Sequence, residues 1–281
     1  MSLANATRSE ATKQFSTSMW WILAIVLVAY VAFTAAILGF VFSAASSGSL
    51  PGNAPQIPAD GLPAILYSTA TAIGYVFPLL IGTLMVTTEF RHKTLTPTFL
   101  ATPKRGVVLW AKIVVGIGVG VLFGILGVLS SVVPAAGLLA AHGLHTDLTS
   151  PDTWALFGRM ILAFVLWVLV GIGVGALVRN QVGAIVGVLV FTQFLEPVGR
   201  AAAAFVDGLS DVTRFLPGAA SDALVGASVF TAATPGGSGG DPLEWWAGGL
   251  VLLGYAVVLL VLGHLFSWRR DLIRARPDQI R

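Results

Sequence analysis

Residues Met19–Ala44 read MWWILAIVLVAYVAFTAAILGFVFSA, a continuous apolar stretch without a charged side chain. A helix needs about 20 mainly apolar residues to cross the hydrocarbon layer of a membrane. The stretch exceeds that length, and it is also longer than the apolar part of a secretory signal peptide, which is about 7–15 residues. We therefore expect a transmembrane helix here that is retained in the protein.

The whole chain has the same apolar character. Of its 281 residues, 56% are hydrophobic and 10% are charged, and the mean hydropathy is +0.87. A soluble protein carries about 25% charged residues, so this composition indicates an integral membrane protein. The sequence has no cysteine, which excludes disulfides, zinc–thiolate and iron–sulfur sites, and a thiol nucleophile.

Five more apolar stretches follow the first, and we expect an all-α integral membrane protein with six transmembrane helices. Lys112 suggests a short interfacial turn before the third span, and Pro134 is expected to kink that span. Glu196-Pro197 is expected to interrupt a short fifth span. A lead of residues 1–18 precedes the spans and a basic tail of residues 269–281 follows them. The expected spans are 19–44, 64–87, 113–139, 154–178, 182–195 and 246–268.

Basic residues are distributed unevenly over the segments between these spans. Cytoplasmic loops of membrane proteins carry an excess of Lys and Arg. If the N-terminus is cytoplasmic, then of the 16 basic residues Arg159, Arg200 and Arg214 fall outside and the other 13 fall inside. We therefore expect both ends on the cytoplasmic side of the cell (inner or plasma) membrane.

Motifs for nucleotide or metal chemistry are missing from the sequence. A phosphate-binding Walker loop needs a lysine directly after a glycine, whereas the four lysines follow Thr12, His92, Pro103 and Ala111. If ATP drives this protein, a separate polypeptide must bind it. We expect no catalytic residue, cofactor or metal in the chain, and no enzymatic activity.

His142, His145 and Asp147 have a spacing that a metal site would tolerate. They lie in a short outer loop without a fourth candidate ligand, so a solvated loop is the preferred interpretation.

Glycines recur at a spacing of four within the spans, which is typical of helices that pack closely in lipid. We interpret them as packing residues, and a surface that slides during conformational change is the alternative. They are Gly116, Gly120 and Gly124, then Gly171 with Gly175, and Gly183 with Gly187.

Ionisable side chains are almost missing from the interior of the spans. Arg159 and Glu196 come closest, and both are expected near the outer interface, where they form a possible polar pair. The alternative for Arg159 is that its head group snorkels to the interface. A proton- or sodium-coupled carrier is expected to hold a carboxylate near the middle of the membrane, and the sequence offers none there.

A polar, basic segment, Thr87–Arg105, lies between the second and third spans. Thr96 can cap a short helix with Pro97 at its first position, and Pro103 prevents its continuation. This helix would present Phe99 and Leu100, which suit a groove in a partner protein. A juxtamembrane loop whose cations contact anionic lipid is an equal alternative.

The same segment resembles the loop between spans two and three of type 2 ATP-binding-cassette (ABC) permeases. Thr88-Glu-Phe-Arg-His-Lys-Thr-Leu, followed by Leu100-Ala-Thr-Pro-Lys-Arg, carries the resemblance, together with Phe215-Leu-Pro-Gly-Ala-Ala and the six spans. The chain departs from the family pattern at Lys93, where glycine is expected.

The resemblance implies a role for each of these segments. Residues 3–18 would form an interfacial helix along the inner leaflet, and residues 196–226 a helical hairpin re-entering the outer leaflet. Two permease copies, as a homodimer or a heterodimer, would pair around a central path. The residues implied to couple the chain to ATPase subunits are Glu89, Phe90, Arg91, Thr96, Phe99 and Leu100.

The resemblance thus implies the membrane-spanning subunit of an ATP-driven exporter, with ATP and Mg²⁺ on the partner subunit. The apolar, nearly charge-free spans favour a hydrophobic or amphipathic substrate such as a drug-like molecule, lipid or peptide. An ATP-independent secondary carrier or lipid scramblase is the main alternative. A further one is a scaffold or sensor subunit that docks through the tail Arg269–Arg281.

Overall fold

The computed structural model describes residues 2–48, 59–94, 105–178, 180–203, 205–206, 208–228 and 243–268. Within these ranges the regular structure is entirely helical, without a strand. Six helical stretches are long and apolar enough to cross a membrane, which confirms the expected all-α architecture with six candidate spans.

The candidate spans are built from nine of the described α-helices. Some spans are single helices, and others are divided or contain a π-helical turn. The first span is α2 (Met19–Ser46), and the second is divided into α3 (Leu62–Tyr67), α4 (Thr69–Gly74) and α5 (Val76–Arg91). The third, fourth and sixth are α7 (Arg105–Ala141), α8 (Pro151–Leu177) and α14 (Trp245–Gly263), which ends in the π-helical turn η2 (His264–Trp268). The fifth consists of α9 (Gln181–Val190), the π-helical turn η1 (Phe191–Leu195) and α10 (Glu196–Ala202).

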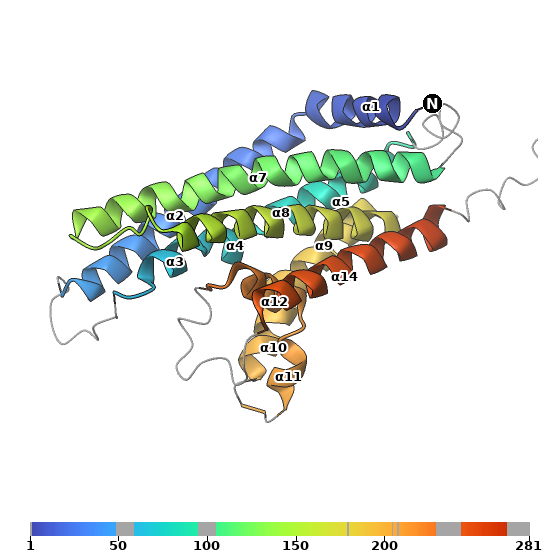
Figure 1. Ribbon diagram of the computed structural model, residues 1–281. Helices are drawn as coiled ribbons and strands as arrows, with labels where there is room; N and C mark the ends of the chain where they lie inside the picture. The colour runs from blue at the N-terminus through green and yellow to red at the C-terminus, as the bar shows by residue number, and fades with distance from the viewer. Residues whose placement is uncertain are drawn as a thin grey trace, which may run out of the picture.

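Three helices lie outside the candidate spans: α1 (Leu3–Ser16), α11 (Leu209–Thr213) and α12 (Pro217–Val225). Figure 1 shows an elongated bundle in which α2, α7, α8 and α14 run along its length, and α1 lies against the first part of α7. Helices α10 and α11 project from one side of the bundle, at the bottom of the view.

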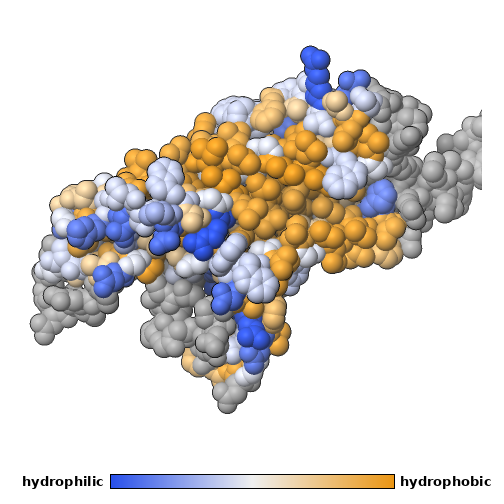
Figure 2. Space-filling model, viewed as in Figure 1, coloured by the Kyte–Doolittle hydropathy of each residue, from blue (hydrophilic) through white to orange (hydrophobic). Residues whose placement is uncertain are grey.

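The second and fourth spans form the centre of the bundle. In each of these two spans, 78% of the most apolar 18-residue segment is buried inside the protein. The corresponding share is 17% to 28% in α2, the fifth span and α14. The apolar side chains left exposed on those outer spans include Phe33, Phe194 and Leu250. Figure 2 shows such apolar surface across the middle of the molecule, with polar surface at one end and on the projecting part. This distribution suits a bundle surrounded by lipid.

Glycines let the two central spans approach each other closely. A Cβ atom on Gly82 of α5 would collide with the carbonyl oxygen of Val168, and one on Gly171 of α8 would collide with that of Leu79. A Cβ on Gly175 would lie 2.6 Å from the oxygen of Thr83. Apolar lipid gives no hydrophobic drive for helix association, so such close backbone contact supplies the packing energy.

The third span differs from the expectation. Helix α7 begins at Arg105 and continues through Lys112 and Pro134 to Ala141, so it has no interfacial turn before Ile113. Its 37 residues extend over about 55 Å, more than the hydrocarbon thickness of about 30 Å. Lys112 does not end the helix because its ammonium group is satisfied within the protein, as described below.

The fifth span also differs from the expectation that Glu196-Pro197 interrupts it. The helical stretch continues to Ala202, and the turn before Pro197 changes to π-helical geometry. The backbone N–H of Glu196 donates to the carbonyl of Phe191, five residues earlier. This wider turn lets the chain pass into α10 with Pro197 in its first turn, where proline is tolerated.

Replacement of Gly171 by alanine tests the packing of the central spans. We expect Gly171→Ala to lower the free energy of unfolding by about 1–3 kcal/mol, because the added methyl group meets the backbone of α5. Thermal unfolding in detergent measures the effect.

The matched control is Gly187→Ala in α9, where a Cβ atom would have no neighbour within 4 Å. This variant is expected to leave the unfolding temperature unchanged or raise it, since alanine favours helix. Equal effects at the two positions would contradict the assignment of Gly171 to a close helix contact.

Candidate functional site

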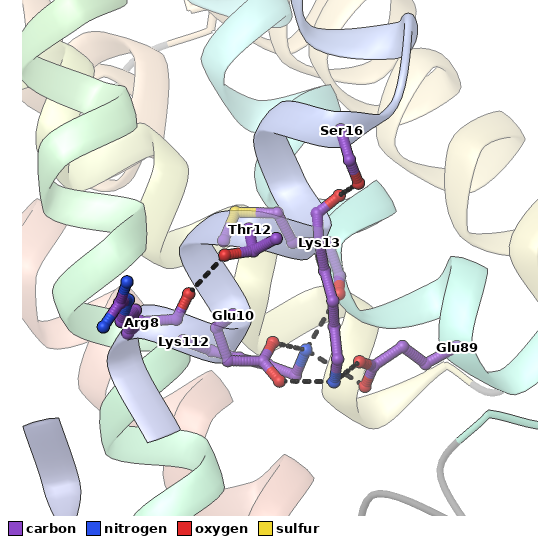
Figure 3. Close-up of polar contacts among 8 residues, drawn as sticks. Arg8, Glu10, Thr12, Lys13, Ser16, Glu89 and Lys112 are labelled. Carbon is purple, nitrogen blue, oxygen red and sulfur yellow. Dashed lines mark hydrogen bonds and ion pairs between the residues drawn. The ribbon is translucent and has the colours of Figure 1, made fainter. Parts of the chain in front are cut away.

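Four charged side chains from α1, from the end of α5 and from the beginning of α7 meet where α1 packs against α7 (Figure 3). Lys112 Nζ of α7 lies 2.6 Å from Glu10 Oε2 of α1 and 3.0 Å from Glu89 Oε2 of α5. Lys13 Nζ of α1 lies 2.7 Å from Glu10 Oε1 and 3.0 Å from Glu89 Oε1. Each carboxylate therefore contacts both ammonium groups, and we call these four residues the charge cluster.

Helical spacing explains how α1 supplies two members of the cluster. Ser2 caps the helix, its Oγ accepting from the backbone N–H of Asn5. Glu10 and Lys13 are three residues apart and so share a face of the helix. Ala6, one turn before Glu10, is buried on the same side. The apolar surface of this face is small, so the charged contacts contribute much of the attachment of α1 to the bundle.

Lys112 is the most buried member of the cluster, with 1% of its side chain exposed. Its ammonium group donates to Glu10 Oε2 and, at 3.2 Å, to the carbonyl oxygen of Met85. The ion-pair contact with Glu89 provides a third oxygen. An isolated buried ammonium is very costly, whereas one surrounded by acceptors is tolerated.

The cluster is electrically balanced, with two carboxylates and two ammonium groups. Burial alone would raise the pKa of the Glu10 carboxyl, but Lys112 and Lys13 outweigh burial and hold that pKa below its ordinary value of 4.5. Burial would likewise lower the pKa of Lys13, but Glu10 and Glu89 outweigh it and raise that pKa above 10.5. Both groups on α1 are therefore charged over a wide pH range.

The structure divides the predicted coupling residues into different environments. Glu89 is buried in the charge cluster, where its carboxylate contacts Lys13 of α1 and Lys112 of α7. It therefore does not face a partner protein. Phe90 is partly buried against the apolar core, and Arg91 is exposed. Thr96, Phe99 and Leu100 lie outside the described residues.

Lys93 forms the turn that the family pattern assigns to glycine. Its φ angle is +55°, in the left-handed region that glycine adopts most readily. The N–H of Lys93 donates to the carbonyl of Phe90, and the N–H of Thr94 donates to the carbonyl of Glu89. These two bonds make a Schellman C-cap, so helix α5 ends in an ordered, exposed turn despite the missing glycine.

The possible outer pair, Arg159 and Glu196, is not formed. Glu196 is 2% exposed, and its Oε1 accepts from the backbone N–H of Ala219 at the beginning of α12, at 3.0 Å. The guanidinium group of Arg159 lies beside Gly226, and its Nε donates to the carbonyl of Ala155. Glu196 is thus held at the beginning of α12, and Arg159 lies beside Gly226 at the end of that helix.

Sequence reasoning missed Glu10, Lys13 and Lys112 as site residues. A lysine inside an apolar helical stretch was the available signal, because it requires acidic partners.

A metal site finds no support in the described part of the chain, where no three His, Asp or Glu side chains come together. Neither the protein-family models nor the curated proteins with which the sequence was compared gave a match.

Removal of the buried ammonium group tests the charge cluster. We expect Lys112→Met to destabilise the protein by about 3–5 kcal/mol, because two buried carboxylates are then left with the single, partly exposed ammonium group of Lys13. Thermal unfolding of the purified protein measures the loss. Adding Glu10→Gln to this variant is expected to restore part of the stability, since one uncompensated charge is removed.

Arg8→Met is the control, because Arg8 is an exposed cation on the same helix. It is expected to change stability by no more than about 0.5 kcal/mol. If Lys112→Met behaved like Arg8→Met, the cluster would have no structural role.

The pKa shifts on α1 give a pH prediction. The lowered pKa of Glu10 contributes stability that is complete above pH 4.5 and is lost as the pH falls through the shifted value. The raised pKa of Lys13 contributes stability that is complete below pH 10.5 and is lost as the pH rises further. We therefore expect α1 to stay docked from pH 4.5 to 10.5.

A spin label on α1 measures this, since the chain has no cysteine of its own. A label at exposed Ser9→Cys should keep a constant line shape between those limits and become mobile below the lower one. A label at exposed Trp154→Cys, near the beginning of α8, serves as the reference. A mobility change centred near neutral pH would contradict the prediction.

Proposed function

We propose that this chain is the membrane-spanning subunit of an ATP-driven exporter of the type 2 ABC kind. One observation carries the proposal: the Thr88-Glu-Phe-Arg segment ends a central span, and its glutamate is bonded to two other helices through the charge cluster. The sequence lacks a Walker lysine, so an ATPase partner must supply ATP and Mg²⁺.

The charge cluster supplies a route for force. A partner that contacts the exposed turn after Arg91 acts one turn away from Glu89. Through Lys112 and Lys13, movement of Glu89 is passed to α7 and to α1, which leads into α2. The cluster thus joins three of the six candidate spans to the segment where the partner binds.

The surface of the spans supports a hydrophobic or amphipathic substrate. The spans α2, α9 and α14 expose apolar side chains along their length, and the most apolar segment of each candidate span holds at most two charged residues. A small ion would need polar ligands along its path. In this proposal two permease copies enclose the path, with both ends of each chain in the cytoplasm and α10–α12 in the outer leaflet.

Co-purification with a candidate ATPase subunit tests the proposal. The wild-type chain is expected to retain an ATPase that contains a Walker loop, and Arg91→Glu combined with Phe99→Asp is expected to abolish retention. Glu89→Ala is unsuitable, because it would disturb the charge cluster inside the permease itself.

Arg8→Glu is the matched control, since it reverses an exposed cation on α1 and is expected to keep the ATPase bound. The proposal fails if the wild-type chain retains no such ATPase, or if the double variant retains it as well as the wild type does. Thermal unfolding of each variant separates loss of the partner from loss of the fold.

An ATP-independent carrier is the second candidate, and the buried carboxylate of Glu196 within the candidate fifth span favours it. Ionisable groups inside membrane spans often belong to ion pathways. Substrate flux in ATP-free vesicles that follows a proton or sodium gradient would support this candidate. Flux that requires the ATPase subunit would exclude it.

A further inference from the structure

The second and fifth candidate spans each lose regular helical geometry next to a proline. In the second span, Pro78 has no N–H for the carbonyl of Gly74, and the helix is interrupted at Tyr75 between α4 and α5. In the fifth span, Pro197 follows the π-helical turn η1.

The carbonyl of Thr192 in η1 lacks both of its usual helical donors. Its α-helical donor would be the N–H of Glu196, which instead bonds to Phe191. Its π-helical donor would be the next residue, Pro197, which has no N–H. A buried carbonyl without a partner is costly, and water is not available inside a membrane to satisfy it.

Tyr75 supplies the missing donor from the interruption in the other span. Its hydroxyl group donates to the carbonyl oxygen of Thr192 at 3.0 Å, and both side chains are buried. The ring of Tyr75 stacks on Trp167 of α8, with 4.6 Å between the ring centroids and 30° between the planes. This stacking fixes the direction in which the hydroxyl group points.

The same region holds the outer helix α12 in three places. Trp167 Nε1 donates to Ser221 Oγ at 3.1 Å, and Glu196 accepts from the N–H of Ala219. Arg200 of α10 lies 2.7 Å from Asp222 Oδ2. A Cβ atom on Gly218 would lie 2.5 Å from the Glu196 carboxylate, so α12 is also packed directly against the fifth span.

We propose that Tyr75 is a latch between two hinges: it holds the interruption of the second span against the π-helical turn of the fifth, so that both spans bend together and carry α12 with them. The latch does not depend on the substrate or on the source of energy. Its physical basis is that Pro197 leaves one carbonyl unsatisfied and the hydroxyl group of Tyr75 satisfies it.

A double-mutant cycle tests the latch. Tyr75→Phe keeps the ring stacking but removes the donor, and we expect backbone amides of residues 193–202 to exchange with deuterium about tenfold faster. Pro197→Ala restores an N–H that can reach Thr192. In that background, Tyr75→Phe is expected to change exchange by no more than about twofold.

Tyr255→Phe is the matched control, because Tyr255 is exposed and its hydroxyl group donates to the carbonyl of Phe215 instead. It is expected to leave exchange in residues 193–202 unchanged. An equal increase for Tyr75→Phe in both backgrounds, or no increase in either, would overturn the proposal.

Spin labels measure the coupled movement directly. With labels at exposed Asp152→Cys on α8 and Val198→Cys on α10, the distance distribution is expected to broaden in Tyr75→Phe and to stay as in the wild type in Tyr255→Phe. An unchanged distribution in Tyr75→Phe would show that α10 is held without the latch, and would also overturn the proposal.

Discussion

The buried ammonium group of Lys112 sets the arrangement of one end of the molecule. A cation in an apolar environment must be surrounded by acceptors, and these are the Glu10 carboxylate of α1 and, from α5, the Met85 carbonyl and the Glu89 carboxylate. Well-packed apolar side chains can stabilise as much as a buried ion pair does, so stability alone does not explain the cluster. Its specific effect is to fix the position of α1, whose small apolar face would otherwise permit several positions.

The close contact between α5 and α8 and the interrupted parts of the second and fifth spans follow different physical rules. Around Gly82 and Gly171 the backbones of α5 and α8 are in direct contact, and close-packed backbone has little freedom to move. Beyond Leu79 the second span is divided, and the fifth span contains its π-helical turn. In these two spans the helix therefore departs from regular geometry outside the stretch around Gly82 and Gly171, where the backbones are in contact.

The sequence was sufficient to predict the six apolar spans, because length and hydropathy are local properties. The errors concern polar residues whose partners lie far away in the chain. Lys112 seemed to require an interfacial turn, and Glu196-Pro197 seemed to end a span, because their acceptors and donors come from α1 and α12. Glu89 was predicted to contact a partner protein for the same reason: its actual partners, Lys13 and Lys112, lie on α1 and α7. A hydrogen bond from a backbone N–H to a carboxylate, such as that from Ala219 to Glu196, cannot be predicted from residue identities.

The charge cluster also has a consequence for the order of assembly. Glu10 and Lys112 are separated by 102 positions, so during synthesis the carboxylate leaves the ribosome first. At about 5–20 residues per second, its partner follows about 5–20 s later. Until the third span is inserted, α1 has no buried site to occupy, and its charges remain hydrated at the membrane surface. Docking of α1 therefore requires that the third span is already in place.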